Sequence, residues 1–434
     1  MTWKQSESVR IDILAIGSHG DVLPTVALGR GLQRAGHRVR IVTLGGFEDV
    51  VRSHGLDHLC IGDSPRDIAK SAAGLDWVEH RTGTIGFLRG FVRVAASMIE
   101  TGIANYWPAS RDAEALILTP LGIPIGVHIA ERLGIPLVRI SYAPTRQDWA
   151  GREHLTTALR GDVEALMVAG ARLLVWSRLR NVTNMARQKI LSLPPLPRRE
   201  PSKAMNRRGV PLLEAYSAAV VPRPSNWGSW IHVTGYWFLE EPGGWKPPAE
   251  LVRFLGAGTP PVFVGFGSTP FPGPDVATDT VVDALSRIRQ RGVVVAGGSG
   301  LRTGRLTDDI LSVESVPHGW LFPRVSAAVH HGGAGVTAAA LRAGLPSVVV
   351  PIFGDQPFWA QRVFQLGAGP RPIPAKRLSA TALAEAISRA RDDETFRCQA
   401  TRIGRQIRAE DGVARAVEAI QDHLATAPAA RRVS

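Results

Sequence analysis

The chain has 434 residues, of which 44% are hydrophobic, so it is long enough for two large domains and its composition excludes wholesale disorder. No uncharged apolar run reaches the roughly 18 residues that a membrane-spanning helix needs. The polar first ten residues do not resemble a secretory signal, and the two distant cysteines suit a reducing cytoplasm rather than a disulfide framework. With 51 Lys and Arg against 38 Asp and Glu, the net charge of +13 favours anionic partners.

The first part of the chain alternates between short apolar runs and amphipathic segments. The predicted strands are 11–16, 39–44, 115–118 and 137–140, and the predicted helices are 26–35 and 127–133. Continuous apolar strands that alternate with helices are typical of a parallel sheet with helices on both faces. We therefore expect an α/β domain here.

A second α/β region follows a stretch that is rich in Pro and Arg (194–224) and a Pro/Gly segment (240–248) that is typical of a linker. Its predicted strands are 262–266, 293–296, 327–330 and 347–350, and its predicted helices are 281–289 and 334–343. Ligands of such sheets bind at the carboxyl ends of the strands. Two such halves predict a site in the cleft between them.

The positive charge is concentrated between residues 176 and 209, where nine basic side chains accompany one acid, Glu200. The basic residues are Arg178, Arg180, Arg187, Lys189, Arg198, Arg199, Lys203, Arg207 and Arg208. No zinc-finger spacing, RNP-like strand or heptad zipper accompanies them, so we expect no nucleic-acid binding. Two interpretations stay open: a solvated arginine-rich face, or peripheral docking of 178–208 on an anionic membrane.

A glycine-rich turn follows the predicted strand 327–330 and opens the next predicted helix. It reads His330-His331-Gly332-Gly333-Ala334-Gly335-Val336-Thr337. Glycines let the backbone approach a ligand, and the amides and dipole of a helix N-terminus attract anions. The turn therefore indicates a phosphate site, with an ordinary tight turn and two incidental histidines as the alternative.

An acidic residue and an amide, Asp355 and Gln356, follow the predicted strand 347–350. Such a pair can both accept and donate hydrogen bonds to sugar hydroxyls. One strand–turn–helix unit separates it from the phosphate turn, so both would lie on one edge of the sheet. The alternative is that Asp355 only caps a helix.

Together with Gly265-Phe266-Gly267-Ser268 and Gly17-Ser18-His19-Gly20-Asp21, these motifs resemble the GT-B nucleotide-sugar glycosyltransferases. The resemblance covers nearly the whole chain and is closest to the branch of sterol glucosyltransferases and bacterial glycopeptide and polyketide glycosyltransferases. It implies the GT-B fold, two Rossmann-like doubly wound domains facing across a cleft. It also implies a UDP- or TDP-sugar in the C-terminal domain and a hydrophobic, hydroxylated acceptor in the N-terminal domain.

The resemblance also implies boundaries: an N-terminal domain 1–238, a linker 239–250, a C-terminal domain 251–412, and a tail 413–434 that crosses back to the N-terminal domain. Most implied donor contacts lie in the C-terminal domain, with His331 and 333–337 on the diphosphate and Asp355 and Gln356 on the sugar. The full implied set is Ser18, Gly20, Gly267, Ser268, Val316, His318, Trp320, His331, Gly333, Ala334, Gly335, Val336, Thr337, Asp355 and Gln356.

The chain departs from the family pattern at two of these places. Ser315 stands where a tryptophan stacks on the base in plant relatives, which leaves backbone contacts or Trp320 for base recognition. Val336 stands where many relatives carry a hydroxyl residue, so one phosphate contact is lost unless Thr337 replaces it.

The N-terminal motif carries the candidates for the catalytic base. Inverting transfer needs a group that deprotonates the acceptor hydroxyl as it attacks the anomeric carbon. By the resemblance, macrolide and plant enzymes use a histidine at the position of His19, whereas glycopeptide- and sterol-type enzymes use the aspartate at Asp21. This chain carries both, and we favour Asp21.

No Asp-x-Asp sequence is present, so we expect no metal and no cofactor beyond the sugar nucleotide. The sequence predicts a cytoplasmic inverting hexosyltransferase, peripheral to the membrane if the basic stretch docks there, and leaves monomer and homodimer open. A secondary metabolite is the first acceptor class and a sterol or glycolipid the second. A sugar-nucleotide epimerase and a non-catalytic partner protein are the alternatives of other classes.

Overall fold

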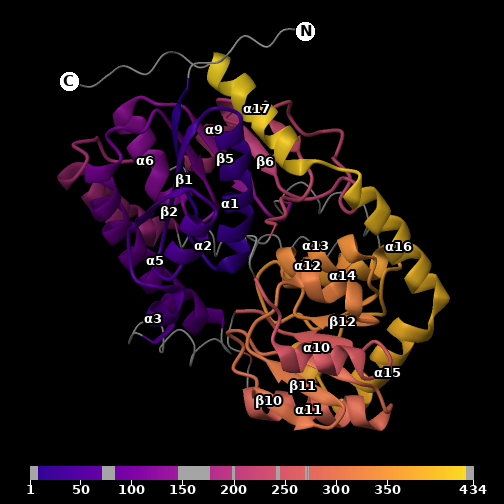
Figure 1. The fold of residues 1–434 in the computed structure, drawn as a ribbon. Coiled ribbons are helices and arrows are strands. Elements are labelled where there is room, and N and C mark those ends of the chain that lie inside the picture. Colours follow the sequence, from indigo (N-terminus) through magenta and orange to yellow (C-terminus); the bar gives the residue numbers. More distant parts are fainter. Residues whose placement is uncertain are drawn as a thin grey trace, which may run out of the picture. The chain divides into compact units, whose positions relative to one another are not determined.

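The computed structural model describes residues 8–70, 84–144, 176–197, 201–240, 245–268, 271 and 273–426. The chain divides into two compact units (Figure 1). Unit 1 comprises 1–215, 223–239 and 412–434, and unit 2 comprises 216–222 and 240–411. Both units are α/β domains built on a sheet of mostly parallel strands, as the sequence predicts.

The sheet of unit 1 has the order β3-β2-β1-β4-β5-β6-β7, and its described strands are all parallel. The strands are β1 (Arg10–Leu14), β2 (Arg38–Thr43), β3 (Asp57–Cys60), β4 (Ala115–Leu118), β5 (Leu137–Ser141), β6 (Leu212–Glu214) and β7 (Ile231–Val233). In the centre, Ile13 pairs with Ile41 on one side and Ile117 on the other. These apolar strands are buried on both faces, which explains their uninterrupted hydrophobic runs.

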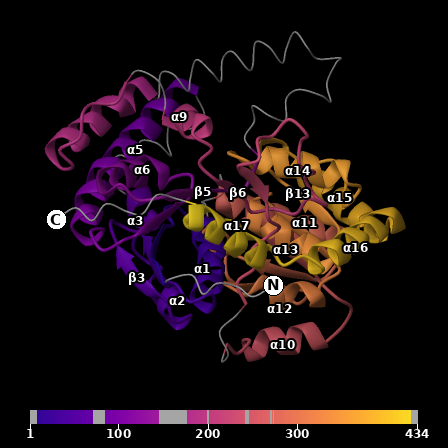
Figure 2. The ribbon, with the colours of Figure 1, turned by 90° about the horizontal axis from the view of Figure 1, so that it is seen from above.

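Helices cover both faces of this sheet (Figure 2). On one face lie α1 (His19–Arg34), α2 (Glu48–Ser53) and α17 (Gly412–Thr426); on the other lie α5 (Thr84–Tyr106), α6 (Ile123–Leu133) and the helical stretch 176–189. The shorter helices are α3 (Pro65–Lys70), η1 (Trp107–Ala109) and α9 (Pro201–Arg207). The C-terminal helix α17 packs on α1 at Gly31, where a Cβ atom would lie 2.4 Å from Cγ1 of Val413.

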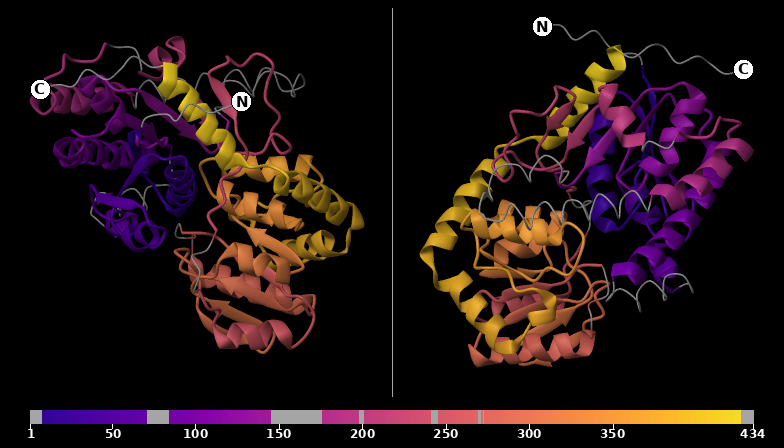
Figure 3. Two further views of the ribbon diagram at one scale, coloured as in Figure 1. Left: turned by 45° about the horizontal axis from the view of Figure 1, so that its top comes forward. Right: turned by 180° about the vertical axis from the view of Figure 1, so that it is seen from behind.

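Figure 3 shows unit 2 from two further sides. Its sheet has the order β10-β11-β9-β8-β12-β13, and only β10 is antiparallel to its neighbour among the described strands. The strands are β8 (Val262–Gly265), β9 (Gly292–Val295), β10 (Gly304–Thr307), β11 (Ile310–Val313), β12 (Ala327–His330) and β13 (Ser347–Val349). The helices and 3-10 turns are α10 (Ala249–Gly256), α11 (Pro274–Arg287), α12 (His318–Leu321), η2 (Phe322–Arg324), α13 (Ala334–Ala343), α14 (Gln356–Gln365), η3 (Ala375–Arg377), α15 (Ala380–Asp392) and α16 (Glu394–Arg408). One face packs on α11 and α15, and the other on α10, α12 and α13.

Residues 216–222 fall within the predicted N-terminal domain but belong to unit 2. The ring of Tyr216 packs edge-on against Trp359, with centroids 6.1 Å apart. The hydroxyl of Ser217 donates to Glu410 at 2.8 Å, and the carbonyl of Val220 accepts from Nε of Arg362 at 2.5 Å. These contacts, which the sequence pattern does not indicate, attach this short segment to α14 and to the end of α16.

The basic stretch is partly buried in the structure. Arg187 is buried and paired with Glu131, and its Nη1 also lies 3.0 Å from Nδ1 of His128. Arg180 donates to the carbonyl of Leu196. The exposed cations among the described side chains are Arg178, Lys189, Arg207 and Arg208, while Arg198, Arg199 and the side chain of Lys203 lie outside the described residues. In the described part, no helix is both long and apolar enough to cross a membrane.

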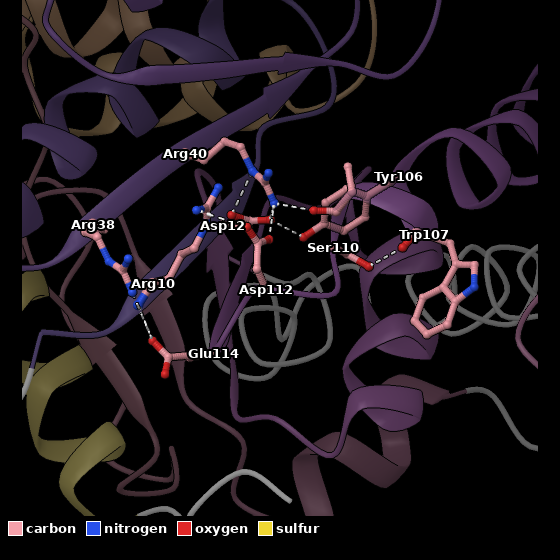
Figure 4. Close-up of polar contacts among 10 residues, drawn as sticks. Arg10, Asp12, Arg38, Arg40, Tyr106, Trp107, Ser110, Asp112 and Glu114 are labelled. Carbon is pink, nitrogen blue, oxygen red and sulfur yellow. Dashed lines mark hydrogen bonds and ion pairs between the residues drawn. The ribbon is translucent and has the colours of Figure 1, made fainter. Parts of the chain in front are cut away.

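A buried carboxylate in the middle of β1 joins this strand to β2 and to α5 (Figure 4). Asp12 on β1 accepts hydrogen bonds from Arg40 on β2 and from the hydroxyl of Tyr106, at 2.5 and 2.7 Å from its Oδ2. Arg40 also reaches Asp112, which pairs with Arg10. Burial raises the pKa of Asp12, and the hydrogen bonds and charge of Arg40 oppose that rise.

We expect Arg40→Met to destabilise unit 1 by about 3–5 kcal/mol, because it leaves a buried charge without its partner. Arg38→Met on the same strand is the matched control, since Arg38 is two-thirds exposed and lies 4.0 Å from Glu114. An exposed pair of this kind contributes roughly 0–1 kcal/mol. Urea unfolding of the two variants measures the difference, and equal losses would contradict a structural role for the Asp12–Arg40 pair.

Candidate functional site

In unit 2, the turns that follow four neighbouring strands lie together at the carboxyl edge of the sheet. These turns follow β9, β8, β12 and β13, which are adjacent in that order. A Cβ atom on Gly298 would lie 2.2 Å from the carbonyl oxygen of Ser268, and one on Gly332 would lie 3.0 Å from the carbonyl oxygen of Gln356. The turns therefore touch through their backbones, as the predicted motif positions require.

His331 occupies a slot between two glycines. A Cβ atom on Gly267 would lie 2.6 Å from its Cε1, and one on Gly333 would lie 2.5 Å from its Nε2. Gly267 also has a φ of +80°, which side chains rarely adopt. Within the described part of the chain, Nδ1 of His331 is buried and has no hydrogen-bond partner. The ring is thus held in place by backbone on both sides.

The imidazole of His331 is neutral at neutral pH. Burial lowers its pKa to about 4, and a hydrogen bond with the Gly265 backbone only partly opposes this. Burial also lowers the pKa of His318 to about 4 and that of His330 to about 3, and the proximity of His331 adds to both shifts. Without a bound anion the ring is therefore neutral and carries a single N–H group.

The first turn of α13 offers backbone amides without a capping side chain. Gly333 is the N-cap residue and makes no side-chain cap, so the first amides of the helix are available to an anion. The side chain of Thr337 is 1% exposed, its buried hydroxyl has no partner among the described residues, and its amide donates to the carbonyl of Gly333. Of the two alternatives at Val336, this burial does not favour the one in which Thr337 supplies the missing hydroxyl.

Asp355 and Gln356 lie at the start of α14 with different roles. Asp355 is exposed at the N-cap position, but its carboxylate makes no cap and instead accepts from Nε1 of Trp359 at 2.9 Å. Gln356 is buried, and its Oε1 accepts from the amides of Ile352 and Phe353. Asp355 therefore keeps an exposed carboxylate oriented by Trp359, whereas Gln356 has only its NH2 group left for a ligand.

The residues predicted near the nucleobase separate in the structure. His318 stacks on Phe322, with centroids 4.6 Å apart, and is close enough to His331 to influence its own pKa. Trp320 instead packs edge-on against Trp245 and lies under Arg324. Neither of these two neighbours belongs to the four turns. Val316 is buried, and Ser268 is exposed in the turn after β8.

In unit 1, Ser18 and Asp21 form a capping box at the start of α1. Ser18 is the N-cap residue: its Oγ accepts from the amide of Gly20, and Oδ2 of Asp21 accepts from the amide of Ser18 at 2.8 Å. Gly17 has a φ of +140°, and a Cβ atom there would lie 2.2 Å from Oδ2 of Asp21. The turn thus uses Ser18 to cap the helix and orients the half-buried carboxylate of Asp21.

His19 lies beside Asp21 as the first residue of α1 and is exposed. Its ring packs edge-on against Phe47, with centroids 5.0 Å apart. The hydroxyl of Tyr142 donates to the carbonyl oxygen of Asp21 at 2.8 Å, a contact that the sequence analysis missed. The signal for it was the position of Tyr142 directly after a predicted strand, at the same sheet edge as the turn after β1.

The aromatic residues before β4 are candidates for the lining of an apolar acceptor pocket, with core or loop packing as the alternative; they are Trp77, Phe87, Phe91 and Trp107. Trp77 and the side chains of Phe87 and Phe91 lie outside the described residues. Trp107 is described, and it packs beneath Arg111. Among the described residues, no three His, Cys, Asp or Glu side chains are grouped so that they could hold a metal ion.

Comparisons with known proteins match both units. Residues 11–149 match the glycosyltransferase family 28 N-terminal domain, and residues 279–421 match the erythromycin biosynthesis protein CIII-like C-terminal domain. A sterol 3-beta-glucosyltransferase of Arabidopsis thaliana is 34% identical over 96% of this chain, and one of Aspergillus terreus is 35% identical over 98%. The chain spans 66% of the length of the plant relative and 30% of the length of the fungal one.

Solved structures show the same fold. The kitacinnamycin glycotransferase superposes with a TM-score of 0.70 at 20% identity, covering 96% of this chain and all of that one. CalG4, the calicheamicin glycosyltransferase, gives a TM-score of 0.68 at 20% identity over 98% of this chain and all of that one. The Streptomyces glycosyltransferase SsfS6 in complex with thymidine diphosphate gives 0.60 at 18% identity, over 95% of this chain and 99% of that one.

This chain has two Rossmann-like units and a glycine-rich turn that opens a helix, and it shares its fold with GT-B proteins. Within that class, the chain belongs to the family 1-like GT-B glycosyltransferases. The fold and family that the sequence motifs predict are thereby confirmed.

We expect the thermal midpoint of unfolding to fall as the pH is lowered from about 6.5 to about 4. The folded-state pKa values of His318, His330 and His331 lie below the ordinary histidine value, so the unfolded chain binds protons first. Each such group removes about 1.4 kcal/mol of stability per pH unit in that window. His318→Phe preserves the stacking on Phe322 and removes one titrating group, so about one proton fewer is taken up on unfolding and the free energy of unfolding falls less steeply with pH. An unchanged pH dependence would contradict these assignments.

Proposed function

We propose that this protein transfers a hexose from a UDP- or TDP-sugar to a hydroxyl group of a hydrophobic acceptor, with inversion at the anomeric carbon and without a metal ion. The observation that carries the proposal is the neutral ring of His331, held between Gly267 and Gly333 beside the uncapped start of α13. Backbone amides and an N–H donor gathered at one helix N-terminus suit a diphosphate. Asp355 in the adjacent turn suits the sugar hydroxyls.

The diphosphate acquires negative charge as the bond from the anomeric carbon to its oxygen breaks. The uncapped first-turn amides of α13 are already oriented for that charge, the ring of His331 lies beside them, and the helix dipole adds about half a positive charge at this end. Stabilisation of this kind needs no reorganisation during the reaction. It supports departure of the leaving group without a bound cation.

Unit 1 supplies the base in this proposal. As the acceptor oxygen attacks the anomeric carbon, its proton passes to the base and the nucleoside diphosphate leaves from the opposite side, which inverts the configuration. We favour Asp21, because the amide of Ser18 and the carbonyl contact from Tyr142 orient it. His19, exposed on the same turn, is the alternative.

A sterol hydroxyl is the acceptor that the relatives favour. The sterol 3-beta-glucosyltransferases are 34–35% identical across nearly this whole chain, whereas the natural-product enzymes share the fold at 20% identity or less in the comparisons given above. This reverses the order expected from the motifs, which placed a secondary metabolite first. An antibiotic-type aglycone is therefore the second candidate.

Asp21→Asn should lower kcat by about 10²–10⁴-fold while leaving the donor KM within about twofold, because the amide keeps the shape of the side chain but cannot take up the proton. His19→Gln should have the smaller effect. Asp49→Asn, at the exposed first turn of α2 in the same unit, is the control and should behave like the wild type. Near wild-type kcat in both Asp21→Asn and His19→Gln would exclude the proposed mechanism.

Acceptor and donor are tested together in one panel. UDP-glucose and TDP-glucose are each incubated with a 3β-hydroxysterol, the matching 3-ketosterol and a polyketide aglycone, with and without EDTA. We expect transfer to the 3β-hydroxysterol, a β-linked product by NMR, and no effect of EDTA. Epimerised sugar nucleotide formed without any acceptor would instead identify an epimerase, and nucleotide binding without turnover on any acceptor would identify a non-catalytic protein.

A further inference from the structure

One buried side chain of the glycine-rich turn has no part in the proposed reaction. His330 is the last residue of β12, is fully buried, and pairs in register with Gly265 of β8 and Val349 of β13. It precedes His331, whose ring lies in the slot between glycines. A polar ring in the middle of the sheet needs a reason beyond filling space.

The Nδ1 atom of His330 accepts a hydrogen bond from the amide of Gly332 at 3.1 Å. Burial and the neighbouring His331 and His318 lower the pKa of His330 to about 3, so the ring is neutral. A neutral imidazole that accepts at Nδ1 carries its proton on Nε2. In the described part of the chain, that Nε2 atom is buried without a partner.

This pattern argues against a packing role alone. An aliphatic side chain would fill the same volume without burying an unpaired N–H group, which is unfavourable in a protein interior. The ring nitrogen that does have a partner is the one that holds Gly332. The contact with Gly332 is therefore what distinguishes histidine from an apolar residue here.

The hydrogen bond between the Gly332 amide and His330 fixes the orientation of the turn. Gly332 has a φ of +86°, and its amide points inward to His330. The next residue, Gly333, is the uncapped N-cap of α13 and closes the slot around His331. With the Gly332 amide directed inward, the amides that follow it at the start of α13 are the ones left for an anion.

We propose that His330 is a positioning residue, which holds the turn 331–333 through the Gly332 amide and so presents His331 and the first amides of α13 to the donor diphosphate. It touches no substrate itself. The inference rests on the proposed function, because it assumes that a nucleoside diphosphate binds at this turn. It adds a residue whose effect is on donor binding rather than on the chemical step.

Two substitutions distinguish the loss of the hydrogen-bond acceptor at His330 from a change in side-chain volume. His330→Asn places a carbonyl oxygen where Nδ1 stands, whereas His330→Leu fills the space without an acceptor. Calorimetry on the full chain with UDP and with TDP should show about tenfold weaker binding for His330→Leu and a Kd within about threefold of wild type for His330→Asn. The donor KM should follow the Kd, while kcat at saturating donor changes by less than about threefold.

His37→Leu is the matched control for loss of a buried histidine. His37 is buried in unit 1, where its Nδ1 accepts from the amide of Val9. This variant should lower the thermal midpoint without changing the Kd of UDP or TDP. Wild-type binding by His330→Leu, or binding by His330→Asn as weak as that of His330→Leu, would overturn the inference.

Hydrogen exchange of the Gly332 amide separates a failure of this inference from a failure of the proposed function. The amide should be protected in the wild type and in His330→Asn and should exchange faster in His330→Leu. If the wild type bound neither nucleotide, the proposed function would fail, and with it the diphosphate part of this inference. Unchanged exchange in His330→Leu would overturn the positioning role itself, whether or not nucleotide binds.

Discussion

Close backbone contact at glycines is the constraint on which the unit 2 site depends. The ring of His331 fits only because Gly267 and Gly333 carry no side chains, and the turns after β8 and β9 touch only because Gly298 carries none. Adding a single methyl group at any of these places would require the ring or the neighbouring carbonyl to move. Rigidity of this kind comes from steric exclusion, so the site is preformed before any ligand arrives.

Anion recognition at this site relies on backbone amides and on neutral side chains. The chain carries a net charge of +13, yet residues 265–268, 296–299, 331–337 and 351–356 include no Lys or Arg. Val336 carries no hydroxyl, and the hydroxyl of Thr337 is buried. The amides of α13 and the neutral His331 are left as donors, and their strength comes from fixed orientation in a partly desolvated turn. The excess positive charge therefore lies elsewhere on the surface.

The sequence predicts most reliably those features that depend on short-range pattern. The strands 115–118 and 327–330 and the helix 334–343 have their predicted bounds, because each is marked by an apolar run or by neighbouring glycines. The short strand β6, by contrast, has only three residues and no distinct signal. Side-chain direction is harder still: Trp320 turns toward Trp245, and Arg187 is buried against Glu131, because residues far away in sequence decide both orientations. Sequence motifs thus predict which turns converge but not which side chains within them face a ligand.

The turn that carries the proposed base shows how local sequence can serve two requirements at once. Asp21 closes the capping box of α1, so the hydrogen bonds that start the helix also fix the direction of its carboxylate. Gly17, at a φ of +140°, makes room for that carboxylate. Contacts within residues 17–21 therefore orient the carboxylate, and the hydroxyl of Tyr142, directly after β5, holds the backbone carbonyl of Asp21 from outside the turn. Because this orientation depends on local contacts, other segments of unit 1 can vary in sequence while the carboxylate of Asp21 stays in place.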